Sequence, residues 1–176
     1  DVLARRLRRL GLADVHQAAD GLEALEKVRS ERFDIVLLDV MMPRMNGIEA
    51  LQAMRDEGWL QKTPAVMISA ASEIETVVRC IELGAEDYLP KPFNPALLAA
   101  RVSAVLERKF LRDTNQRQLD RLERELAEAW ACQKSMLPTE FPVDPARLDI
   151  FATVDPALEG GGDLYDVFEI APGLIA

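Results

Sequence analysis

The sequence has few of the features that mark secreted or membrane proteins. Only two cysteines occur, Cys80 and Cys132, and both lie in helix-like stretches, so we expect reduced thiols rather than a disulfide. No basic-then-apolar signal segment opens the chain. Uninterrupted apolar runs reach only a handful of residues, far short of the roughly 20 that span a membrane. These absences predict a cytoplasmic protein without a membrane partner.

Basic residues are also scarce. The chain carries 21 Lys and Arg against 30 Asp and Glu, a net charge of −9, and residues 137–176 hold eight acidic residues and one basic residue, Arg147. A DNA-binding module normally shows a basic face, so we expect no nucleic acid partner. The acidic surface suits divalent cations or simply confers solubility, and charge alone does not choose between these explanations.

The first 110 residues alternate between helical and strand patterns. Apolar runs or alternation predict strands at 15–18, 35–38, 65–68 and 88–89. Helical spacing predicts helices over 2–10, from the N-cap Asp20, from Gly47, from Ser72 to Gly84, and from Pro95 onward. The apolar stripes of the second and fourth helices are expected to include Leu22, Ile74, Val78 and Ile81. This alternation indicates an α/β fold, a parallel sheet with helices on both faces.

Polar residues stand at the ends of three predicted strands: Asp39, Ser69 and Lys91. Ligands of parallel sheets bind beyond the carboxyl ends of the strands, so these side chains are expected to share a crevice. A carboxylate nucleophile, a hydroxyl donor and a lysine that neutralises phosphoryl oxygens suit phosphoryl transfer. Each residue taken singly could be an ordinary buried hydroxyl or surface charge, but the combination favours a site.

Three segments resemble the signatures of response-regulator receivers: DIVLLDVMMPRMNGIEAL from Asp34, PAVMISA from Pro64 and DYLPKPF from Asp87. The resemblance implies a doubly wound, flavodoxin-like fold, a sensor histidine kinase as partner and Mg²⁺ as cofactor. It assigns Asp39 as phosphoacceptor and metal ligand, and the Met41 carbonyl as a further ligand. Ser69 and Tyr88 become the switch residues, and Lys91 the phosphate-binding lysine, followed by a cis peptide to Pro92.

One departure from that family concerns the first strand. The family carries an acidic pair at its end, which helps to hold the metal, whereas this sequence starts inside the first helix. The first strand is therefore expected to be missing, leaving a gap in the centre of the sheet, and the chain as it stands should bind Mg²⁺ and accept phosphate poorly.

The helix that begins at Pro95 is expected to continue to about Leu137, with no proline or glycine inside. From Leu119 onward its apolar residues step by three and four, as in a heptad seam: Leu119, Leu122, Leu126, Ala129, Gln133 and Met136. The pattern favours a parallel dimeric coiled coil, the alternative being a solvated helix folded back on the first domain.

After Pro138 the pattern changes to strands, expected at 148–154, at 164–170 and from Leu174, with a Gly160–Asp163 turn. QKSMLP from Gln133 and GGDLYDVF from Gly161 resemble the start of protein phosphatase 2C-type serine phosphatases, specifically the bacterial branch acting on anti-sigma-factor antagonists. This resemblance implies two Mn²⁺ or Mg²⁺ ions, bridged by Asp163 and bound also by the Leu164 carbonyl, with Asp166 as a second acidic position. The alternative is an ordinary tight turn of Gly and Asp.

Three regions follow from this reasoning: a receiver at 1–110, a coiled-coil linker helix at 111–137, and the start of an α+β phosphatase-like domain at 138–176. The expected function is a two-component response regulator that controls a metal-dependent protein-serine/threonine phosphatase through phosphorylation of Asp39, with a phosphoserine protein as substrate. The fragment itself is expected to be inactive as a phosphatase. The alternative is an adaptor whose inactive phosphatase-like domain binds a sigma or anti-sigma factor. A DNA-binding output is disfavoured by the acidic composition.

Overall fold

The structure, a computed structural model, describes residues 2–12, 14–70, 74–92, 94–139, 141, 150–154, 164–171 and 174–176. The chain divides into two compact units, residues 1–113 and 114–176. The expected N-cap Ser72 and the Gly160–Asp163 turn, including the expected metal ligand Asp163, lie outside the described residues.

A parallel sheet forms the centre of the first unit, as the sequence predicts. It contains β1 (Val36–Asp39), β2 (Ala65–Ser69) and β3 (Asp87–Pro90), in that order. β1 pairs with β2 from Val36 opposite Ala65 to Asp39 opposite Ile68, and β2 pairs with β3 in the same direction. All five residues of β2 are buried, which explains why this strand reads as a continuous apolar run.

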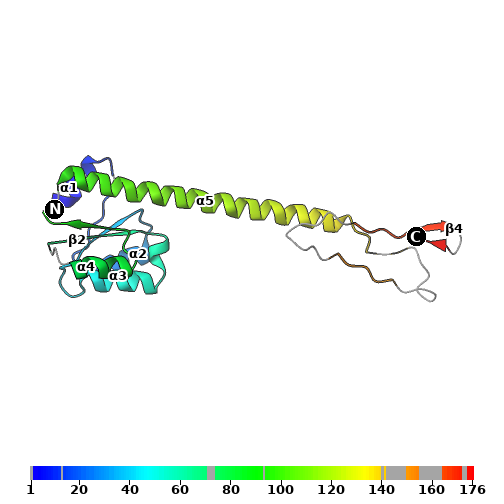
Figure 1. Ribbon diagram of the computed structural model, residues 1–176, viewed down its shortest axis with the longest axis horizontal. Coiled ribbons are helices and arrows are strands. Elements are labelled where there is room, and N and C mark those ends of the chain that lie inside the picture. The colour runs from blue at the N-terminus through cyan, green and yellow to red at the C-terminus, as the bar shows by residue number, and fades with distance from the viewer. Residues whose placement is uncertain are drawn as a thin grey trace. The chain divides into compact units, whose positions relative to one another are not determined.

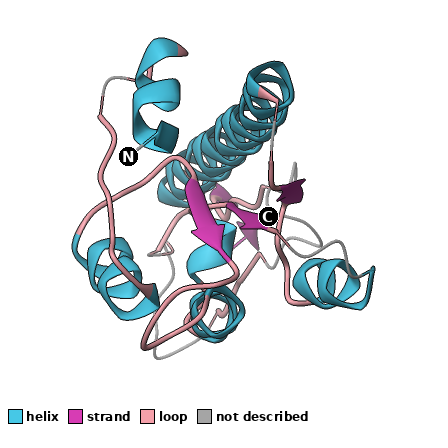
Figure 2. Cartoon of the chain, turned by 90° about the vertical axis from the view of Figure 1, so that its left-hand side faces the viewer, coloured by secondary structure: helices cyan, strands magenta, loops and turns pink. Residues whose placement is uncertain are grey.

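Helices cover both faces of this sheet (Figures 1 and 2). α1 (Val2–Arg9) and the start of α5 (Pro95–Ser135) lie on one face. α2 (Gly21–Ser30), α3 (Gly47–Asp56) and α4 (Ile74–Glu82) lie on the other. Each face has its own apolar cluster. Leu7, Val66, Ile68, Leu89, Leu98, Val102 and Val105 form one, and Leu25, Val28, Leu38, Leu51, Met54, Met67 and Cys80 belong to the other.

Local signals set the helix ends. Asp20 caps α2 by accepting the Glu23 amide at 3.0 Å. Asn46 caps α3 in a capping box with Glu49, in which each side chain accepts the other residue's backbone amide. Gly84 follows α4 with φ +97°, a left-handed conformation that glycine adopts without a steric penalty.

The segment 15–18, predicted as a strand, is not one. Instead of a neighbouring strand it faces a cavity of about 420 Å³, whose opposite wall includes Val36, Leu37 and Leu38 of β1. A strand needs a partner for its backbone groups, and here side chains supply one: Arg8 donates to the Val15 carbonyl and Lys27 to the Gln17 carbonyl. The cavity lies beside β1, the edge strand of the described sheet, and the gap expected in the centre of the sheet stays a prediction.

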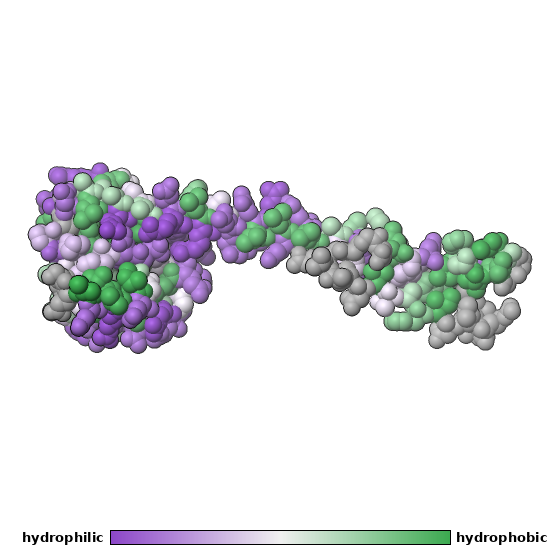
Figure 3. Space-filling view, in the orientation of Figure 1, coloured by the Kyte–Doolittle hydropathy of each residue, from purple (hydrophilic) through white to green (hydrophobic). Residues whose placement is uncertain are grey.

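Two of the expected apolar stripes face solvent in part. Leu22 of α2 is 41% exposed, and Ile74, Val78 and Ile81 of α4 are 78%, 48% and 49% exposed. Figure 3 shows a green, hydrophobic patch in the region of α4, in agreement with the exposure of these apolar residues. In α4, burial falls instead on Cys80, because one side of a short helix is enough to cover its part of the sheet.

The second unit contains the continuation of α5 and a short antiparallel pair, β4 (Glu169–Ala171) and β5 (Leu174–Ile175). The strand predicted at 164–170 is therefore shortened to its last residues, and residues 150–154 of the strand predicted at 148–154 are not in a strand. Past Val105, none of the described residues is buried, so these strands have little to pack against. Within the described residues, no helix is long and apolar enough to cross a membrane.

Candidate functional site

The carboxyl ends of three adjacent strands bring the predicted polar residues together. Asp39 is the last residue of β1, Ser69 the last of β2, and Lys91 directly follows β3. The Lys91 backbone amide donates to the Ser69 carbonyl at 2.6 Å, which joins the last two strand ends. The three residues that the sequence predicts to share a site thus lie at the same edge of the sheet.

Asp39 and Lys91 form an ion pair between Asp39 Oδ2 and Lys91 Nζ. The other carboxylate oxygen, Oδ1, accepts the Met41 backbone amide at 3.1 Å. The Asp39 side chain is 34% exposed and the Lys91 side chain 37%, so a phosphate donor can reach both from solvent. A nucleophilic carboxylate beside a lysine can accept a phosphoryl group whose oxygens the lysine then neutralises.

The two expected switch residues differ in their surroundings. Ser69 is fully buried at the end of β2. Tyr88, in β3, is half-buried and packs against the apolar cluster beneath α2, α3 and α4. The peptide between Lys91 and Pro92 is cis, as the resemblance implies. The switch roles of Ser69 and Tyr88 stay predictions.

The loop between β1 and α3 closes tightly on the end of β1. The Gly47 amide donates to the Val40 carbonyl at 3.1 Å. A Cβ atom at Gly47 would lie 2.2 Å from the Asp39 carbonyl oxygen, closer than any side chain allows. Glycine is therefore required here for the close approach of α3 to the candidate phosphoacceptor.

Sequence reasoning missed Arg44, which lies in the same loop. Its guanidinium pairs with Asp20, the N-cap of α2, whose side chain is 2% exposed. The hydrogen bond from the Glu23 amide lowers the pKa of Asp20, burial opposes that shift, and Arg44 lowers the pKa further. Arg44 adopts φ +58°, a left-handed conformation that costs an ordinary residue about 1–2 kcal/mol. The local sequence Pro-Arg-Met-Asn at residues 43–46 gives no indication that Arg44 pairs with Asp20.

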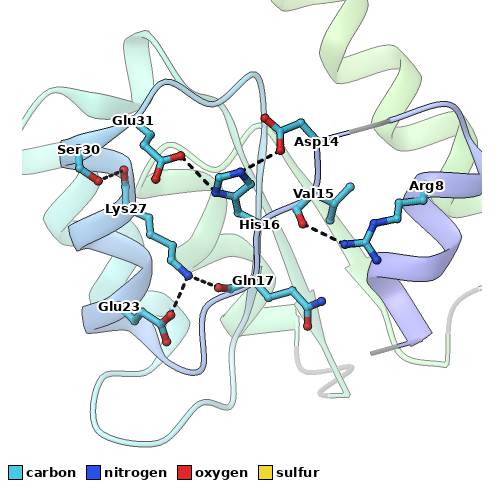
Figure 4. Close-up of polar contacts among 9 residues, drawn as sticks. All are labelled: Arg8, Asp14, Val15, His16, Gln17, Glu23, Lys27, Ser30 and Glu31. Carbon is cyan, nitrogen blue, oxygen red and sulfur yellow. Dashed lines mark hydrogen bonds and ion pairs between the residues drawn. The ribbon is translucent and has the colours of Figure 1, made fainter.

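A second polar cluster lines part of the cavity beside β1 (Figure 4). His16 lies between two carboxylates, with Nε2 at 2.9 Å from Asp14 Oδ1 and Nδ1 at 3.2 Å from Glu31 Oε2. Lys27 pairs with Glu23 at 2.7 Å while it donates to the Gln17 carbonyl. These contacts hold the segment 14–18 to α2 across from β1.

The residues present fit a divalent cation only in part. The Asp39 carboxylate and the Met41 carbonyl would supply two oxygen ligands, whereas Mg²⁺ takes six in an octahedral arrangement. Among the described residues, no group of three or more His, Cys, Asp or Glu side chains could hold a metal ion. For the expected phosphatase metals, Leu164 is described and exposed, while Asp163 is not described.

The family pattern for the response regulator receiver domain matches residues 1–103. The chain belongs to this family. The match covers the sheet, the helices on both of its faces and all three polar strand ends, so the fold expected from the sequence motifs is confirmed.

Several curated proteins similar to this receiver are named as transcriptional regulatory proteins. The CpxR homolog of Haemophilus influenzae is 48% identical over 95 residues, which cover 54% of this chain and 40% of that protein. The alkaline phosphatase synthesis transcriptional regulatory protein PhoP of Bacillus subtilis is 42% identical over 107 residues, or 61% of this chain and 43% of that protein. The chain spans less than half the length of these relatives.

Solved receiver structures are similar as well. The receiver domain of the Francisella response regulator 1452 has a TM-score of 0.55 at 29% identity and covers 61% of this chain and 89% of its own. The chemotaxis protein CheY4 of Vibrio cholerae has a TM-score of 0.55 at 36% identity, over 59% of this chain and 86% of its own.

Proposed function

We propose that this protein is a cytoplasmic response regulator that accepts a phosphoryl group on Asp39 from a sensor histidine kinase. The observation that carries the proposal is the pairing of the Asp39 carboxylate with Lys91 at adjoining strand ends, accessible from solvent. An Asp39 oxygen attacks the phosphorus of the phosphohistidine, the P–N bond breaks, and an acyl phosphate forms on Asp39 while the imidazole leaves. Lys91 then neutralises the phosphoryl oxygens.

A bound Mg²⁺ would supply further charge neutralisation, with the Asp39 carboxylate and the Met41 carbonyl as its ligands from this chain. We propose that the cavity beside β1 takes the first strand that the family resemblance implies, and that the acidic pair of that strand completes the ligand set. The apolar wall formed by Val36, Leu37 and Leu38 suits a buried central strand.

Phosphorylation tests this assignment. In a protein that includes the strand filling the cavity, acetyl phosphate and Mg²⁺ should modify one site, and Asp39→Asn should abolish the modification, as measured by intact-protein mass. Asp34→Asn is the matched control, because the Asp34 side chain is 84% exposed and lies at the opposite end of β1. Modification that persists in Asp39→Asn would overturn the assignment.

We also propose that the output is a metal-dependent protein-serine phosphatase acting on an anti-sigma-factor antagonist. The names of the curated relatives do not bear on this output, because the matches span only 95 and 107 residues. Support comes from the two motif segments themselves. The Tyr165 hydroxyl, in the second segment, lies 3.4 Å from the carbonyl of Pro138, in the first, and the Tyr165 ring packs against Phe141.

Activity of the full-length protein separates this output from an adaptor. A phosphoserine protein should be hydrolysed only with Mn²⁺ or Mg²⁺, and Asp163→Ala should remove turnover because a bridging carboxylate is lost. Glu128→Gln, an exposed change on α5, should leave turnover intact. Absence of turnover in metal-loaded wild-type protein, combined with capture of a sigma or anti-sigma factor, would favour the adaptor.

The linker part of α5 is proposed to pair with a second copy as a parallel coiled coil. Leu119, Leu122 and Leu126 are 54%, 54% and 46% exposed at heptad spacing along one side of the helix. Met136, which is 70% exposed, directly follows the last residue of α5, Ser135. Apolar side chains also interrupt the polar surface of this helix in Figure 3. A second copy offers the same seam, so each leucine gains an identical partner surface.

A further inference from the structure

The loop from Val40 to Asn46 connects Asp39 with α3 and is attached to α2 by two adjacent contacts. The Arg44 guanidinium pairs with the Asp20 carboxylate. The next residue, Met45, accepts the Gly21 amide on its carbonyl at 3.1 Å. A Cβ at Gly21 would lie 2.8 Å from that same carbonyl oxygen, so the loop and the first turn of α2 are in close contact.

Both carboxylate oxygens of Asp20 accept hydrogen bonds. Oδ1 accepts the Glu23 amide at 3.0 Å, and Oδ2 receives the Arg44 guanidinium through Nε and Nη2. A carboxylate this deeply buried is costly unless it is paired. Arg44 holds this contact from a left-handed backbone conformation, and strain of this kind is found where surrounding contacts over-determine a conformation.

We infer that Arg44 is a positioning residue for phosphoryl transfer to Asp39, an inference that rests on the proposed function of Asp39. By pairing with Asp20, Arg44 fixes the loop that carries Met41. The Met41 amide donates to Asp39 Oδ1, which leaves Oδ2 directed toward Lys91. The described contacts join Arg44 to Asp20 and not to Asp39, so its effect on the acceptor oxygen is transmitted through the loop backbone.

The protein contains a matched ion pair far from the site. Arg29, in the last turn of α2, pairs with Glu57, the C-cap of α3, with Nε at 2.9 Å from Oε2. It links the end of α2 to the end of α3, whereas the Asp20–Arg44 contact links the start of α2 to the loop that precedes α3. Removing the Arg44–Asp20 pair, near Asp39, can therefore be compared with removing the Arg29–Glu57 pair, which lies away from Asp39.

The test compares Arg44→Gly, Arg44→Lys and Arg29→Ala in the phosphorylatable protein. Glycine removes the ion pair but relieves the left-handed strain. The midpoint of thermal unfolding should therefore fall less in Arg44→Gly than it would with alanine at this position. Arg44→Gly should slow phosphorylation of Asp39 by acetyl phosphate by about tenfold, the effect of losing one charged hydrogen-bonding partner, and Arg44→Lys should recover part of the rate. Arg29→Ala should leave the rate unchanged.

Hydrogen exchange provides a readout independent of phosphorylation. In Arg44→Gly the Gly21 amide should exchange about tenfold faster, while amides of β2 keep their protection. The double variant Asp20→Asn, Arg44→Gly should be phosphorylated at the same rate as the slower of the two single variants. Each single change already removes the same Asp20–Arg44 interaction, so the second change adds nothing.

Normal phosphorylation of Arg44→Gly, or equal slowing by Arg29→Ala, would overturn the positioning role. If the wild type itself takes no phosphate while Gly21 exchange still accelerates in Arg44→Gly, the proposed function of Asp39 fails and the loop contact alone stands.

Discussion

One helix, α5, belongs to both units, and it has apolar residues that are buried in the receiver and others that are exposed in the second unit. In the receiver, Leu98, Val102 and Val105 are 1%, 2% and 0% exposed, because they pack on the sheet. In the second unit, Leu119, Leu122 and Leu126 are about half exposed at similar helical spacing. The comparison shows that helical periodicity identifies a face to be covered, whereas the covering partner is a matter of tertiary or quaternary structure.

The receiver buries apolar clusters on both faces of its sheet. These clusters stabilise it without a contribution from the second unit. The described part of the second unit buries no residue, and two strands of three and two residues cannot hold a core. The second copy proposed for the α5 seam would give the exposed apolar side chains of this helix a surface to pack against.

The largest difference between the units should appear on truncating a leucine in each. Leu51→Ala removes a fully buried side chain from the receiver and should lower its free energy of unfolding by about 2–5 kcal/mol. Leu122→Ala, half exposed in α5, should change receiver unfolding by less than about 0.5 kcal/mol. Urea denaturation followed by circular dichroism measures both. Similar losses would mean that the seam is packed against the receiver, the folded-back alternative for this helix.

The next prediction concerns association through the seam. Leu122→Asp with Leu126→Asp places charges in the proposed apolar interface and should convert a dimer to a monomer that still accepts phosphate on Asp39. Ala127→Asp with Ala131→Asp introduces the same charges at the same spacing on exposed positions outside the seam and should remain dimeric. Light scattering gives the masses. A dimer that survives the leucine changes would place the interface elsewhere, with the exposed Ile74, Val78 and Ile81 of α4 as the next surface to test.

The smallest effect is the pH dependence of an ion pair within the receiver. Hydrogen bonding from Arg29, with help from Trp59, lowers the pKa of Glu57 from 4.5 to about 2. Because the folded pKa is depressed, the stabilisation is fully present above pH 4.5 and is lost as the pH falls toward 2. Arg29→Met should flatten receiver stability across this window in acid titrations, whereas Arg121→Met, on the second unit's exposed Arg121–Glu125 pair, should not. An unchanged acid profile in Arg29→Met would show that Glu57 has no such role.

Local patterns were sufficient for much of the receiver. The apolar run of β2 is buried throughout, and that of β1 buries Leu38. Residues at the ends of such parallel strands meet at the carboxyl edge of the sheet, which is why the proximity of Asp39 and Lys91 could be predicted. The N-cap role of Asp20 and the start of α5 at Pro95 were equally readable, because capping depends on chemistry within a few residues.

Other features required the tertiary structure. Residues 15–18 have a strand-like sequence, yet among the described residues no strand pairs with them, and the carbonyls of Val15 and Gln17 accept hydrogen bonds from side chains instead. Arg44 and Asp20 are 24 positions apart, and only the packing of α2 against the loop after β1 brings their charges together. Composition and spacing describe what a residue can do, but a buried ion pair or a cavity beside a strand exists only when distant segments meet, since burial and hydrogen bonding depend on neighbours in space.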